Sequence, residues 1–366
     1  MSVMKYYRLI GVAAASVLSL SAFAVLTSTK DVKLNRDFQI QTVSGDASYL
    51  NGVGLEGVIK TEKDSFEKVI VSNDSVDFES TKYDMYRNVG EDVLENRDVY
   101  RGIYFPKTLQ TDDYLIVAAL TNGFPYTTDV PTINLNIKDN KTGHVSKFKS
   151  VLDVTRTDYV YNEVLHENAG RYYYAVLIRG MNTNSDRILL YTINPKTGEF
   201  KKDYELKMGD ILGLNMVGDK LVTTSYSEKE GEQLVLLDLN SQEVKEVKTP
   251  GQGLFEYRDP LYVSNEQLFV LNNDKMYPFD FETLTFLKGV NVEPTTLNDD
   301  NNVWLSDFLV KDQTIYTLYG VAGLNILPHQ LLVASDIKTG EVVFEGKMVE
   351  RVDQGVLDSF KLVEVN

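Results

Sequence analysis

Five hairpins recur along this chain at a nearly constant spacing. Each consists of an apolar strand, a short polar turn and a second apolar strand, and successive turns lie 58, 48, 47 and 47 residues apart. The turns are centred on Asp112, Gly170, Gly218, Asn265 and Asp312. A fixed period in the forties is typical of a β-propeller, in which each repeat forms one four-stranded blade. The spacing therefore predicts an all-β fold of this kind.

The repeat that begins at Arg171 shows the pattern most clearly. A strand over 172–179, rich in aromatic and β-branched residues, precedes a polar loop and a second strand over 187–194. A turn ending in Thr197-Gly198 then leads to an outer strand, and Gly supplies the positive φ that such a hairpin needs. The same order returns in four further units, at 115–151, 220–249, 267–289 and 314–348.

The number of blades follows from the inner strands and from two weaker units at the ends of the chain. We expect inner strands at 100–106, 161–167, 211–217, 260–264 and 303–310. One period outside the five hairpins lie Asp64 and Asp358, each beside a weaker strand pattern. The sequence thus predicts about seven blades, and counts from six to eight fit the spacing. We expect C-terminal strands to pair with strands near 38–43, because closing the ring in this way protects sheet edges.

The region 31–99 is the least regular part of the pattern. Residues 81–99 show no clear strand and read as an insertion. Two alternatives stay open at this point: a small accessory β region followed by a five- or six-bladed ring, and a two-sheet sandwich. The predicted organisation is a leader over 1–27 and a propeller domain over 28–366.

The N-terminus carries an export pattern. Lys5 and Arg8 precede a stretch of 18 uncharged residues from Leu9 to Leu26. Ala22-Phe23-Ala24 fits the cleavage site of a signal peptide, whereas an uncleaved helix of this length would reach about 27 Å and act as a membrane anchor. Either interpretation places the rest of the chain outside the cytoplasm, secreted or membrane-anchored, with membrane contact at the N-terminus if the helix is retained.

Composition excludes several classes of function. The net charge of −16 disfavours nucleic acid as a partner, because the surface repels phosphate backbones. The absence of Cys excludes disulfides, thiolate metal sites and Cys nucleophiles. The three histidines, His144, His166 and His329, lie in different repeats, without the close spacing of a His-rich metal motif.

The segment from Ala334 to Phe344 resembles the blade signature of pyrroloquinoline-quinone-type (PQQ-like) propeller repeats, Ala-x-Asp-x-x-Thr-Gly followed by Trp. This chain has Asp336, Thr339 and Gly340 at the signature positions and Phe344 in place of the Trp. Quinoprotein blades each carry a docking Trp, and this chain has a single one, so the resemblance implies a non-enzymatic scaffold without a quinone cofactor. The layout also resembles that of uncharacterised extracytoplasmic propeller proteins of Gram-positive bacteria.

The loops between second and third strands should share one face with the starts of the inner strands. Propellers bind ligands on that face, by analogy of fold. We predict contact residues in an aromatic loop at 122–131 and in an apolar loop at 320–328. Asp186 and Trp304 are two further positions expected on the same face. The predicted contact residues are Phe124, Tyr126, Asp129, Asp186, Trp304, Leu324 and Ile326.

Two functions are compatible with this pattern. The first is a non-catalytic scaffold that binds an envelope protein or a wall ligand, without catalytic residues or cofactors. The second is a calcium-dependent hydrolase or lyase, with the ion held in the central channel by Glu163, Glu256 and Asp307, because carboxylate oxygens are the ligands that calcium takes.

Overall fold

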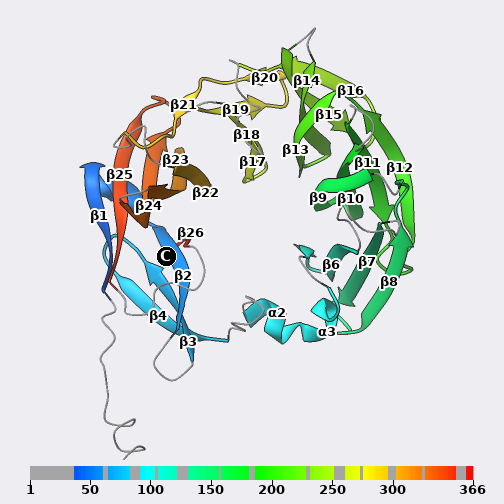
Figure 1. Cartoon of the computed structure of the whole chain (residues 1–366), viewed down its shortest axis with the longest axis horizontal. Helices are drawn as coiled ribbons and strands as arrows, with labels where there is room; N and C mark the ends of the chain where they lie inside the picture. Colours follow the sequence, from blue (N-terminus) through cyan, green and yellow to red (C-terminus); the bar gives the residue numbers. More distant parts are fainter. Residues whose placement is uncertain are drawn as a thin grey trace, which may run out of the picture.

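The computed structural model describes residues 37–60, 65–82, 91–103, 106–121, 131–155, 158–180, 186–227, 231–250, 260–272, 275–295, 302–323, 326–351 and 360–365. Within these residues the chain forms six β-sheets arranged as a ring around a central opening (Figure 1). The all-β propeller predicted from the repeat spacing is therefore confirmed. We number the sheets as blades 1 to 6 in chain order.

Each blade is built on four antiparallel strands, which are named here from the channel outward, and blades 5 and 6 have a fifth. Blade 1 contains β26 (Lys361–Glu364), β2 (Val53–Lys60), β3 (Phe66–Val71) and β4 (Val76–Thr81). Blade 2 contains β5 (Lys107–Gln110), β6 (Tyr114–Thr121), β7 (Thr132–Asp139) and β8 (Val145–Val151). Blade 3 contains β9 (Asp158–Asn168), β10 (Arg171–Gly180), β11 (Asp186–Ile193) and β12 (Phe200–Lys207).

The remaining blades follow the same plan. Blade 4 contains β13 (Asp210–Val217), β14 (Lys220–Ser227), β15 (Gly231–Asp238) and β16 (Val244–Lys248). Blade 5 contains β17 (Leu261–Ser264), β18 (Gln267–Asn272), β19 (Lys275–Asp280) and β20 (Thr285–Phe286), and β21 (Val290–Asn291) also pairs with β19. Blade 6 contains β22 (Asn302–Lys311), β23 (Thr314–Gly323), β24 (Ile326–Asp336) and β25 (Val342–Arg351), with β1 (Asp37–Gly45) as a fifth strand.

The described residues form six blades, and the predicted count of about seven is corrected accordingly. The terminal units around Asp64 and Asp358 are two parts of one blade, since β26 is the inner strand beside β2. The ring also closes a second time, because β1 pairs with β25 from Asp37 opposite Arg351 to Gly45 opposite Phe344. That second pairing confirms the expected contact between the C-terminal strands and residues 38–43.

The segment between blades 1 and 2 differs from the sequence-based expectation. An inner strand was expected over 100–106, but the structure has two short helices, α2 (Glu91–Glu95) and α3 (Arg97–Tyr100), and the inner strand begins at Lys107. The 3₁₀ helix η1 (Ala47–Leu50) joins β1 to β2. The predicted leader over 1–27 lies outside the described residues, and no helix within the described part is long and apolar enough to span a membrane.

Neighbouring blades are held together by buried apolar side chains. Among the described residues, five hydrophobic clusters each span two adjacent blades: 1 with 6, 2 with 3, 3 with 4, 4 with 5, and 5 with 6. The first is centred on Phe344, Leu55 and Leu332, all of them fully or almost fully buried. Apolar burial contributes about 25 cal/mol per Å², so these clusters are the main favourable term that holds the ring.

The junction between blades 1 and 2 is built differently. Here α3 covers blade 2, and Val99 packs against Leu115 and Val117 in a smaller cluster. The Asn136 side-chain amide donates to the Val99 carbonyl, and Lys138 Nζ donates to Asn96 Oδ1 at 2.8 Å. Figure 1 shows α2 and α3 between the two blades. The helices thus fill the place that a facing blade occupies elsewhere.

One local motif is repeated at the turn between the third and fourth strands of blades 2 to 6. A side-chain oxygen accepts hydrogen bonds from backbone N–H groups two or three residues later, which fixes the turn. These oxygens belong to Asp139, Asn194, Asp238, Asp280 and Asp336. The closing position has positive φ, at Gly143 (72°), Gly198 (69°) and Gly340 (76°). In blades 4 and 5, Gln242 (59°) and Leu284 (54°) occupy the same position, so the Asp-x-x-Thr-Gly signature is one of several sequences that form this turn.

We predict that Phe344→Ala will destabilise the protein by about 3–5 kcal/mol, because it leaves a cavity in the cluster that joins blades 1 and 6. Denaturant unfolding followed by circular dichroism measures the effect. Leu287→Ala, which truncates a half-exposed side chain, is the matched control and should change stability by less than about 0.5 kcal/mol. Equal losses in the two variants would contradict the role given to Phe344.

Candidate functional site

The face predicted to bind ligands is the one where the inner strands begin. Asp158 at the start of β9 pairs with Gly180 at the end of β10, and Asn302 pairs with Ala322 in the same way in blade 6. The starts of the inner strands and the loops after the second strands therefore share one face of the ring, as expected. We call it the loop face, and the opposite face, which carries the tight hairpin turns, the turn face.

The structure places three of the seven predicted contact residues in strands. Phe124, Tyr126, Asp129 and Leu324 lie outside the described residues. Ile326 begins β24 and its backbone is paired with Gly323. Asp186 and Trp304 begin or nearly begin strands at the loop face, in blades 3 and 6.

Trp304 is half-exposed, with 52% of its surface accessible. It stands opposite Gly320 in the neighbouring strand, and a Cβ added to that glycine would lie 2.3 Å from the indole ring. The indole is therefore packed on the backbone of β23, in space that only glycine leaves free. A large aromatic side chain that is held in place yet open to solvent is the residue type that dominates binding interfaces.

Asp186 has a supporting position at the loop face. It is only 3% exposed and forms an ion pair with Arg179, with distances of 3.0 Å to Nε and 2.7 Å to Nη2. Its second interaction is with blade 4, since it accepts a hydrogen bond from the Ile211 backbone N–H at 3.0 Å. The carboxylate thus joins two blades and orients the Arg179 guanidinium.

The oriented Arg179 in turn lies over an aromatic ring that the sequence analysis did not single out. Its Cζ is 5.1 Å from the centroid of Tyr161, which is 40% exposed in β9. A guanidinium over a tyrosine ring is favourable by about 0.5–1 kcal/mol at an exposed site. Tyr161 and Arg179 therefore form a fixed surface pair at the loop face of blade 3.

Of the three proposed calcium ligands, Glu163 faces a neighbouring phenol. Tyr174, which is fully buried, donates its hydroxyl hydrogen to the Glu163 carboxylate. Burial raises the pKa of Glu163 above its ordinary value, against the opposing effects of that hydrogen bond and of the Lys107 charge. Desolvation therefore favours the protonated acid at this position.

Asp307 holds the ring closed. Its Oδ2 accepts a hydrogen bond from the Leu362 N–H in β26 at 2.6 Å, and its Oδ1 accepts one from the Phe308 N–H at 2.9 Å. Glu256 lies outside the described residues. In the part of the chain that the structure describes, no three His, Cys, Asp or Glu residues are grouped so that they could hold a metal ion.

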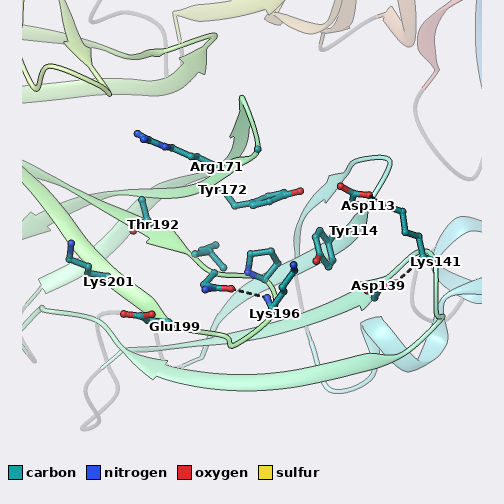
Figure 2. Close-up of a pocket in the computed structure, with 14 residues that line it drawn as sticks. Asp113, Tyr114, Asp139, Lys141, Arg171, Tyr172, Thr192, Lys196, Glu199 and Lys201 are labelled. Carbon is teal, nitrogen blue, oxygen red and sulfur yellow. Dashed lines mark hydrogen bonds and ion pairs between the residues drawn. The ribbon is translucent and has the colours of Figure 1, made fainter.

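The turn face carries a cleft of about 760 Å³ between blades 2 and 3. Tyr114 and Tyr172 meet edge to face in its lining, with ring centroids 5.8 Å apart. Figure 2 shows the ion pair of Asp113 with Lys141 on one side and Lys196 beneath the tyrosines. Its size is within the range of ligand pockets. The sequence analysis did not predict the cleft, since its residues come from two separate repeats.

The charges around this cleft differ from those of the whole protein. Four cationic and three acidic side chains line it, whereas the chain has a net charge of −16. Asp113 is engaged by Lys141 at 2.6 Å, and this ion pair raises the pKa of the lysine. The cleft offers charges and aromatic rings for binding, and its lining contains neither a histidine nor a cysteine.

Comparisons with known proteins identify neither a family nor a function for this chain. No protein-family profile matches the sequence, and no curated protein matches it. Among solved structures, the chain is similar to the structure of YjhT, at 10% identity and a TM-score of 0.39, over 83% of this chain and 98% of that one. It is also similar to the polysaccharide lyase Uly1, at 10% identity and a TM-score of 0.40, over 67% of this chain and 58% of that one.

A third similar structure is the acylaminoacyl peptidase of Pyrococcus horikoshii, at 10% identity and a TM-score of 0.37. The match covers 80% of this chain and 50% of the peptidase. At such identities and scores, the activities of these proteins say nothing about the activity of this chain. The site must be judged from its own residues.

We predict that Glu163→Gln will make the protein more stable at neutral pH. A carboxyl whose pKa is raised by folding stabilises the folded state least at high pH, so stability should fall as the pH rises from the unfolded pKa through the folded one. Gln keeps an acceptor for Tyr174 and removes this titration. Each unit by which folding raises the Glu163 pKa adds about 1.4 kcal/mol to the gain.

Denaturant unfolding of the native chain and the Gln variant between pH 4 and pH 8 measures this effect. The difference in unfolding free energy should grow with pH and vanish below the unfolded pKa of the acid. A variant that is less stable than the native chain at pH 8 would show that the Glu163 carboxylate is stabilised as an ion.

Proposed function

We propose that this protein is a non-catalytic binding scaffold that works outside the cytoplasm and engages an envelope protein or a wall ligand through the loop face of its propeller. The resemblance of the segment from Ala334 to Phe344 to the blade repeat of non-enzymatic PQQ-like scaffolds supports this proposal. The location rests on the export pattern of Lys5, Arg8 and the uncharged stretch that follows.

The observation that carries the proposal is the half-exposed Trp304 at the loop face. The ring is held against Gly320 and presents its other face to solvent. Tyr161 and Tyr226, which are also partly exposed, add aromatic surface on strands of blades 3 and 4. Aromatic side chains provide large contact areas at low entropic cost, both for protein partners and for ring-shaped ligands.

Three acidic side chains among the described residues, two on inner strands and one at the loop face, support the same proposal. Asp307 is engaged by backbone N–H groups, Asp186 by Arg179, and Glu163 by Tyr174. A catalytic pair requires two carboxylates, free and at a set separation, on either side of the bond to be cleaved. These three carboxylates instead take part in packing the blades.

We expect Trp304 fluorescence to report ligand binding directly, because this is the single tryptophan of the chain. Titration of the full chain with purified wall fragments should shift the emission maximum to shorter wavelength as the indole loses contact with water. In cells, a photoreactive phenylalanine at position 304 should crosslink an envelope partner, if the ligand is a protein. The same photoreactive residue at Leu287, also half-exposed, is the control.

Trp304→Ala should abolish binding of the fragments or of the captured protein, with unchanged circular dichroism. If the emission stays constant and position 304 crosslinks no more than position 287, the loop face is not the binding surface. The calcium-dependent enzyme is tested separately by thermal melts with calcium and with excess chelator. Bound calcium at a concentration of 100 times its Kd would stabilise the fold by about 2.7 kcal/mol and raise the melting midpoint. Because the proposed scaffold needs no calcium, we expect the midpoint to be the same with calcium and with chelator.

A further inference from the structure

The outer edge of blade 6 is formed by β1. One side of β1 pairs with β25, and no strand among the described residues pairs with its other side. The pairing with β25 is regular from Asp37 to Thr42, and a bulge follows between Thr42 and Ser44. Gln39 and Gln41 are exposed on this regular stretch. The edge therefore presents backbone N–H and C=O groups to solvent over one straight segment.

The other long outer strands carry charges that hinder edge-to-edge pairing, whereas the single charged residue of β1 is Asp37 at its first position. Lysine is the residue with which sheet edges are most often protected, since a partner strand would have to desolvate it. In β1, every residue from Phe38 to Gly45 is uncharged. The charged residues of the other edges are Asp77 and Glu79 in β4, Lys147 and Lys149 in β8, Lys201, Lys202, Asp203, Glu205 and Lys207 in β12, and Lys245, Glu246 and Lys248 in β16.

We propose that β1 pairs with β1 of a second copy of this chain, antiparallel about a two-fold axis, so that two five-stranded sheets become one continuous sheet. An antiparallel pair of identical strands is self-complementary, as a two-fold interface requires. The uncharged stretch places no like charges opposite each other. That condition matters in a protein of net charge −16, because two copies repel each other over most other surfaces.

The bulge fixes the extent of the pairing. Because it bends the strand after Thr42, the regular stretch Phe38–Thr42 is the part that can align with its own copy. With the axis at Ile40, Gln39 of one copy lies opposite Gln41 of the other, and their amides can exchange hydrogen bonds. Such a short contact buries little area, so we expect a reversible dimer that depends on concentration.

The absence of cysteine allows a direct test by single-cysteine crosslinking. Gln39→Cys and Gln41→Cys are made in the full chain and oxidised separately and as an equal mixture. Opposite residues of antiparallel strands have Cβ atoms about 4.5–5.5 Å apart, close enough for a disulfide after a small adjustment. We expect one of the three samples to form disulfide-linked dimers at least ten times faster than Lys149→Cys, an exposed position in the edge strand β8.

A second variant tests the pairing without cysteine. Gln41→Lys should weaken dimerisation of the full chain about tenfold or more in sedimentation experiments, because each copy then brings a lysine into the paired stretch, where the two charges are diagonal neighbours. Ser146→Lys, on the edge strand β8, should leave it unchanged. The proposal is overturned if none of the cysteine samples crosslinks faster than the β8 control, or if a dimer forms that Gln41→Lys does not weaken.

Discussion

The ring depends on backbone pairing between residues that lie about 300 positions apart. β26 adds the inner strand to blade 1, and β1 adds the outer strand to blade 6, so both ends of the chain are shared between the same two blades. Side chains reinforce the closure, since Lys311 donates to the Gly52 carbonyl at 2.7 Å and Tyr316 to the Tyr49 carbonyl at 2.6 Å. The channel wall and the loop face keep their geometry only while these strands remain paired.

The blades adhere through buried aromatic and aliphatic side chains. In blade 6, Phe344 is fully buried in the cluster shared with blade 1. In blade 3, Phe200 stacks on Tyr191, with ring centroids 4.4 Å apart. A charge network adds to the junction of blades 2 and 3, where Lys202 contacts both Asp153 and Glu205 at 2.6 Å. That lysine lowers the pKa of Glu205 to about 2, so the pair stays ionised at neutral pH.

The sequence allowed the architecture to be predicted because the repeat is encoded locally. Strand alternation and the Asp or Asn turns need no information from other blades, and each was found where the pattern placed it. The number of blades was overestimated because the repeat spacing counts the units around Asp64 and Asp358 separately. The spacing does not reveal that strands from these two units pair to form a single blade. The inner strand at 100–106 was wrong for a similar reason: an aromatic run was assigned to a strand, but Tyr100 ends α3 and packs on blade 2.

The candidate site was less predictable than the fold. Asp186 was predicted to contact a ligand because it follows a polar loop. Arg179 lies directly across the hairpin from it, and this spacing in the sequence already indicated an ion pair. The exposure of Trp304 depends on Gly320, which lies opposite it in the neighbouring strand. The exposure of Tyr161 depends on how the inner strand β9 packs against the adjacent strands. The cleft between blades 2 and 3 arises only when two distant repeats are placed side by side. Exposure is a property of the assembled ring, and no single repeat encodes it.

The helices at the junction of blades 1 and 2 have a mechanical consequence. Within the described residues, every other junction combines two sheets through a shared apolar cluster, which is stiff because packed side chains resist sliding. At this one, a small cluster and a few hydrogen bonds from α3 form the connection. If a pulling force or a bulky object in the channel widened the ring, the strain would concentrate there. The propeller therefore has one compliant joint, on the side of the ring opposite blades 4 and 5.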